Sequence, residues 1–70
     1  MDEETLNLGI RRFLKTVGVG SQRAIEQAVA QALSDGRLSG SETLAATMTL
    51  KIDALDLELS FDERLPLDSA

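Results

Sequence analysis

The sequence predicts a single α+β domain in which two N-terminal helices pack on one face of a C-terminal antiparallel β-meander (ααβββ). Three observations predict this class. Apolar residues in the first half recur at helical spacing, apolar residues in the second half alternate at period two, and a glycine- and serine-rich segment separates the halves. Seventy residues have room for only one small core.

The first half predicts helices over residues 2–17 and 21–35. Gly18 is a natural left-handed stop for the first helix, and Ser21 is a good N-cap for the second. The apolar stripe of the first helix consists of Leu6, Ile10, Phe13, Leu14 and Val17. The stripe of the second consists of Ile25, Ala28, Val29, Ala32 and Leu33.

The second half predicts three strands, over residues 44–52, 55–61 and 65–68. Strict alternation of apolar and polar residues in the first two is typical of strands with one buried face. Residues 62–64 are expected to form a second turn. Pro66 has no amide to donate, so the third strand must lie at an edge.

A two-residue loop at positions 53–54 would set the register of the first two strands. It places Ile52 opposite Leu55 on the apolar face and Lys51 opposite Asp56 on the polar face. The same register pairs Leu50 with Leu57, Met48 with Leu59 and Ala46 with Phe61.

Composition narrows the class of function. The chain has no His, Cys, Tyr or Trp, which removes the commonest general bases, thiol nucleophiles and zinc ligands. We therefore expect no enzyme, no cofactor and no metal site. The net charge of −5, concentrated in residues 37–70, disfavours nucleic acid and anionic membranes as partners. No apolar run approaches the ~20 residues of a membrane span. Acidic residues stand where an export signal needs positive charge, so we expect a cytoplasmic protein.

Four basic residues form the first candidate surface. Arg11, Arg12, Lys15 and Arg23 are expected to cluster where the two helices meet. Such a cluster could contact an acidic partner or nucleic acid, or it could simply be a solvated helix flank.

The first strand is the second candidate surface. Its outward residues Thr47 and Thr49 are small and uncharged, and edge strands are normally protected by charge, proline or cover. Either a helix or the loop over residues 36–42 covers this edge, or the edge pairs with another chain.

Two segments resemble a known family. FLKTVGVGSQRAIEQAV (residues 13–29) and ATMTLKI (residues 46–52) are similar to a family of small bacterial proteins described only as a domain of unknown function. The resemblance spans most of the chain. It implies a bacterial source and an α+β fold, and it carries no activity across.

These observations predict a small non-catalytic interaction module whose partner is an unknown protein or a second copy of the chain, as in a homodimer. The alternative is an anion- or nucleic-acid-binding module that uses the basic flank.

Overall fold

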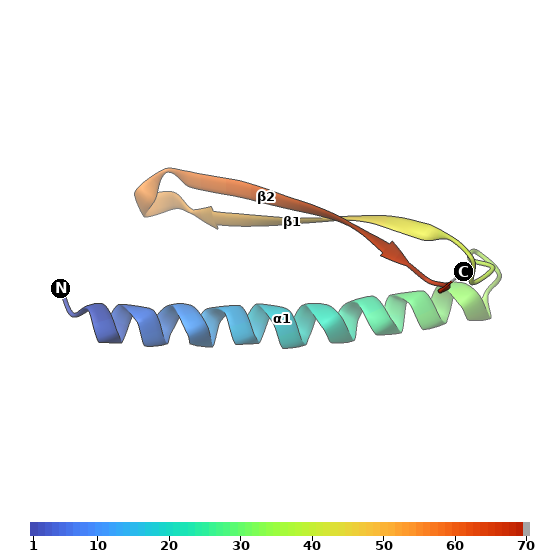
Figure 1. Cartoon of the computed structure of the whole chain (residues 1–70), viewed down its shortest axis with the longest axis horizontal. Coiled ribbons are helices and arrows are strands. Elements are labelled where there is room, and N and C mark those ends of the chain that lie inside the picture. The colour runs from blue at the N-terminus through green and yellow to red at the C-terminus, as the bar shows by residue number, and fades with distance from the viewer. Residues whose placement is uncertain (70) are drawn as a thin grey trace. The chain divides into compact units, whose positions relative to one another are not determined.

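The computed structural model describes residues 1–69 and contains one long helix followed by a β-hairpin (Figure 1). In chain order the elements are α1 (Glu3–Ser34), β1 (Thr43–Ile52), the 3₁₀ turn η1 (Asp53–Leu55) and β2 (Leu57–Pro66). The chain divides into two compact units, one ending at Arg37 and the other beginning at Leu38. The α+β class is confirmed.

Helix α1 begins at Asp2, which is its N-cap. The Asp2 carboxylate accepts hydrogen bonds from the backbone N–H groups of Glu4 (3.0 Å) and Thr5 (3.3 Å), two donors that have no partner within the helix. The Thr5 hydroxyl donates to the other carboxylate oxygen at 2.9 Å. These bonds lower the pKa of Asp2, and the bond from the Thr5 hydroxyl contributes most to that shift.

The prediction of two helices, over residues 2–17 and 21–35, is wrong, because α1 runs through Gly18 and Gly20 without a break. Neither glycine adopts a positive φ, and Ser21 lies inside the helix instead of capping it. An interior glycine costs only about 1 kcal/mol relative to alanine. A break would leave two new helix ends with unpaired backbone groups, which is the larger penalty.

The helix ends one residue before Asp35, its C-cap. Gly36 follows with φ +83°, the left-handed conformation that glycine adopts without strain. The Arg37 side chain reaches back to the Asp35 carboxylate at 2.9 Å, and this contact lowers the pKa of Asp35.

The second unit is an antiparallel hairpin in which β1 pairs with β2 from Thr43–Pro66 to Ile52–Leu57. The connection is η1 followed by Asp56, which has φ 49° and ψ 34°. The Asp56 N–H closes the turn by donating to the Asp53 carbonyl at 3.1 Å.

The predicted register is wrong by two residues, because the connection takes four residues instead of two. Ile52 pairs with Leu57, not Leu55, and Lys51 pairs with Glu58, not Asp56. The apolar face is nevertheless predicted correctly, since side chains alternate with a period of two and a shift of two returns each to the same face.

The predicted third strand, over residues 65–68, is also wrong. Strand β2 continues through residues 62–64 as far as Pro66, and Leu65 pairs with Leu44 of β1. Residues 62–64 include Asp62, a residue common in turns, but no glycine or asparagine that would readily supply a positive φ. Asp62 instead accepts a hydrogen bond from Thr47 across the ladder, which favours continued pairing.

We expect Gly18→Ala to stabilise the protein by about 0.5–1 kcal/mol, because alanine favours the helix and the added Cβ meets no atom within 4 Å. Thermal unfolding followed by circular dichroism at fixed protein concentration measures the change. A loss of stability would contradict a continuous helix, since it would indicate a left-handed residue at this position.

We expect Asp56→Gly to stabilise the hairpin by up to about 1 kcal/mol, because glycine carries no penalty in the left-handed region. Asp56→Val is the matched control and should destabilise the hairpin, since a β-branched side chain is strained there. If both variants melted alike, Asp56 would not have the conformation described.

Candidate functional site

The hairpin has one apolar face that is only partly covered. Three cross-strand pairs form its half nearest the turn: Ile52 with Leu57, Leu50 with Leu59, and Met48 with Phe61. Phe61 is 54% exposed and Leu59 is 47% exposed, although both belong to side-chain types that are normally buried. This face is therefore an apolar surface available for contact.

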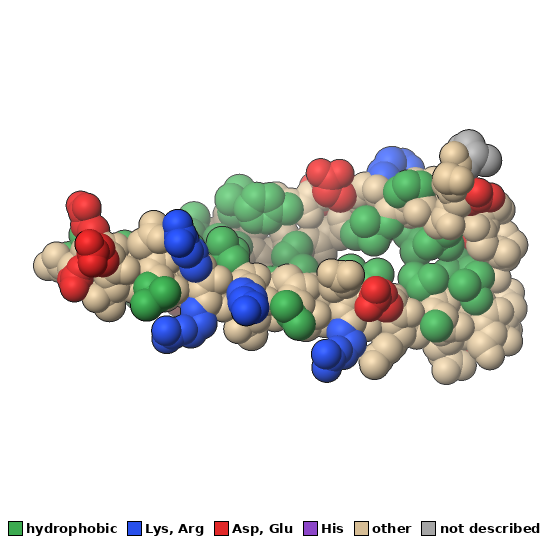
Figure 2. Space-filling model, turned by 60° about the horizontal axis from the view of Figure 1, so that its bottom comes forward, with side chains coloured by type: hydrophobic (Ala, Val, Ile, Leu, Met, Phe, Trp, Pro, Cys, Tyr) green, Lys and Arg blue, Asp and Glu red, His purple; other side chains and the backbone are tan. Residues whose placement is uncertain are grey.

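Helix α1 has a second partly covered apolar surface. Its stripe includes Leu6, Ile10, Phe13 and Leu14, each about half exposed. Among the described residues only Ala32 is buried, with 8% of its surface exposed. Apolar side chains on both units are thus open to solvent, as Figure 2 shows for one face of the molecule.

The opposite face of the hairpin is polar and internally hydrogen-bonded. The Thr47 hydroxyl donates to Asp62 at 2.7 Å, and the hydroxyls of Thr49 and Ser60 lie 3.0 Å apart. Both threonines are exposed, and β1 has β2 as its only strand partner among the described residues. The outer edge of β1 therefore has no strand beside it within residues 1–69, and its use as an interface stays a prediction.

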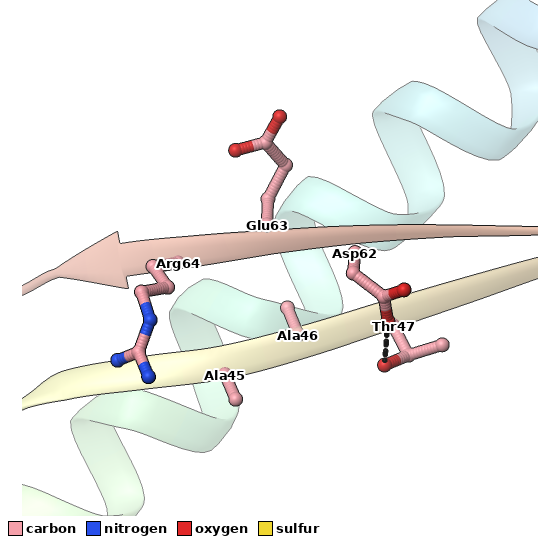
Figure 3. A pocket seen from close by; sticks show the side chains of 6 residues that line it. All are labelled: Ala45, Ala46, Thr47, Asp62, Glu63 and Arg64. Atoms are coloured by element: carbon pink, nitrogen blue, oxygen red, sulfur yellow. Dashed lines mark hydrogen bonds between the residues drawn. The ribbon is translucent and has the colours of Figure 1, made fainter.

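A shallow depression lies around the Thr47–Asp62 pair, near the open end of the hairpin (Figure 3). Its lining residues come from both faces of the sheet, since side chains alternate along each strand. Ala45 and Arg64 form a pair on the polar face, whereas Ala46 and Glu63 form the neighbouring pair on the apolar face. The depression therefore lacks the enclosure of a small-molecule site.

The basic residues do not lie where two helices meet, because α1 is the only α-helix in residues 1–69. At about 100° per residue, the four positions fall within about 120° of one another around α1, on the side away from Leu6 and Ile10. Figure 2 shows Lys and Arg side chains spaced along this helix. The set comprises Arg11, Arg12, Lys15 and Arg23. They form a solvated face that no acidic residue interrupts between positions 11 and 23.

The two units differ in charge. Up to Arg37 the chain has five acidic and five basic residues, net 0, whereas from Leu38 onward it has seven acidic and two basic residues, net −5. Within residues 1–69 no three acidic side chains converge in a geometry that could hold a metal ion.

The segment that leads into β1 is organised by Glu42, a residue that the sequence analysis did not identify. Its carboxylate accepts hydrogen bonds from the backbone N–H groups of Ser39 (2.9 Å) and Gly40 (3.0 Å). These bonds, chiefly that of Ser39, lower the pKa of Glu42 to about 2. The spacing Ser39-x-x-Glu42 is that of a capping box, a motif that normally marks the start of a helix. Here the same motif precedes strand β1.

Comparison with known proteins gives the family but no activity. A family model described as "Family of unknown function (DUF6494)" matches residues 1–68. The chain belongs to this family. No curated protein and no solved structure matches the chain. Within the described residues, α1 is not apolar enough to cross a membrane, and the chain has no other long helix.

We expect Glu42→Gln to destabilise the chain at neutral pH and to lose this effect in acid. The folded pKa of Glu42 lies below its ordinary value of 4.5, so its stabilisation is present above pH 4.5. It is lost as the pH falls from there towards about 2. Unfolding curves of both proteins across this range should converge at the acid end. A difference that stayed constant with pH would contradict the role of the carboxylate.

Proposed function

We propose that this protein is a small non-catalytic module of the bacterial cytoplasm that works by binding another protein chain through its exposed apolar surfaces. The observation that carries the proposal is the half-exposure of large apolar side chains on both units. Contiguous exposed apolar surface is a mark of interaction sites. Covering one half-exposed leucine or phenylalanine gains about 1 kcal/mol, so a set of them provides an affinity.

The stability of the elements supports the same proposal. A two-stranded hairpin is marginal in water unless its apolar face packs against another element. A strand of ten residues spans about 33 Å and a helix of 32 residues about 48 Å, so the two elements differ in length. Some apolar surface remains for a partner.

The chemistry of the chain favours binding over catalysis. It contains no His or Cys, and the depression around Thr47 and Asp62 is not enclosed as a small-molecule site is. Arg11, Arg12, Lys15 and Arg23 provide a positive face that an acidic protein would match. The net charge of −5 from Leu38 onward works against a polynucleotide in the same place.

The experiment measures whether the apolar surfaces are open in the single chain. At micromolar concentration, a soluble paramagnetic probe should broaden the methyl signals of Leu59 and Met48 nearly as much as those of Leu55. Leu55 lies in the turn, is 69% exposed, and serves as the internal reference. Methyl groups that were protected in the monomer would contradict the proposal, since no apolar surface would remain for a partner.

A further inference from the structure

One line of positions along α1 has the spacing of a helix-pairing seam. Residues 6, 10, 13, 17, 20 and 24 follow one another at steps of four and three, the spacing at which side chains of one helix meet a neighbouring helix. At about 100° per residue they lie within about 80° of one another around the axis. None of them is buried.

The size of the side chains along this seam is strongly graded. The first three positions, Leu6, Ile10 and Phe13, are large and 47–51% exposed. Val17 is intermediate, and the last two, Gly20 and Ala24, are nearly the smallest residues available. A neighbouring helix that fits this surface must therefore present small side chains opposite Leu6, Ile10 and Phe13 and large side chains opposite Gly20 and Ala24.

Gly20, like Gly9 and Gly18 of the same helix, has no close neighbour within its own chain, and of the three it alone lies on the seam. A Cβ built at this position meets no atom within 4 Å, and glycine inside a helix costs about 1 kcal/mol relative to alanine. Glycine in such a place allows another backbone or a large side chain to approach closely. The seam is the side of the helix on which this approach would occur.

We propose that the partner of α1 is α1 of a second copy, running antiparallel along this seam. This inference rests on the proposed function and names its partner. Two-fold pairing about residue 15 places each large side chain against a small or medium one. The facing pairs are Leu6 with Ala24, Ile10 with Gly20, and Phe13 with Val17.

A parallel pair does not fit the same surface. It would place Phe13 against Phe13 and Gly20 against Gly20, which forces the helices apart at one end and leaves voids at the other. The antiparallel pair also keeps the basic face in solvent, because the four basic positions lie at least about 100° from the centre of the seam, and the nearest approach is that of Arg23, about 60° from Gly20.

The contact area agrees with a dimer that uses more than one surface. A seam of about 25 overlapping residues is about 37 Å long and 10 Å wide, roughly half of the ~800 Å² that each partner contributes to a stable interface. The half-exposed apolar face of the hairpin provides further area of the same kind.

Cysteine cross-linking tests the pairing, since the natural chain has no cysteine. An equimolar mixture of Leu6→Cys and isotope-labelled Ala24→Cys chains is oxidised, and the disulfide-linked dimers are identified by mass. We expect the disulfide between Leu6→Cys of one chain and Ala24→Cys of the other to form at least about tenfold faster than the corresponding disulfide of the control mixture. The reason is that paired helices hold the two thiols at a high effective concentration. The control replaces Leu6→Cys by Leu8→Cys, a leucine of similar exposure (57%) on the far side of the helix.

Dimers formed between two Leu6→Cys chains would overturn the proposal, since antiparallel pairing keeps these positions about 27 Å apart. Equal rates in the Leu8→Cys control would overturn it as well. If sedimentation shows only monomer while the methyl groups stay open to the paramagnetic probe, self-pairing fails but the interaction function stands. Monomer with protected methyl groups would refute both.

Discussion

The shortage of buried surface is the constraint on which the structure depends. Among the described residues only Ala32 is buried, while large apolar side chains of both units stay about half exposed. Ordering 70 residues costs roughly 100 kcal/mol of conformational entropy, which only extensive apolar burial can offset. A helix and a hairpin that each retain an open apolar face have not completed this burial. Open apolar surface of this kind is the observation on which the proposed binding function rests.

Local polar contacts determine where the helix and the strands begin and end. Apolar packing alone does not determine these positions. Asp2 satisfies the first amides of α1, Asp35 contacts Arg37 beyond its end, and Glu42 binds the amides of Ser39 and Gly40. All three carboxylates are exposed to solvent, so their contacts add little to the stability of the chain. Their main effect is on where the chain turns. The hairpin follows the same rule, since Thr47 and Asp62 hold its register from the polar face.

The candidate surfaces were only partly predictable. The apolar residues of the helix and the hairpin could be assigned to faces from periodicity alone, and the structure confirms the hairpin faces. The basic residues were identified as a group, but their expected position between two helices depended on a helix end at Gly18 that does not exist. Glu42 was missed because its capping spacing precedes a strand, where such a motif is not sought.

The sequence alone determined the α+β class, the helical first half and the two faces of the hairpin, because each follows from the period of apolar residues along the chain. Only the three-dimensional structure decided the length of the helix, the four-residue connection and the absence of a third strand. In each case a local preference opposes backbone hydrogen bonding that extends over many residues. A glycine inside a helix, for example, costs only about 1 kcal/mol of stability, which continuous hydrogen bonding can outweigh. At Gly18 and at residues 62–64 the continuous pairing prevailed, whereas at residues 53–56 the geometry of the turn did.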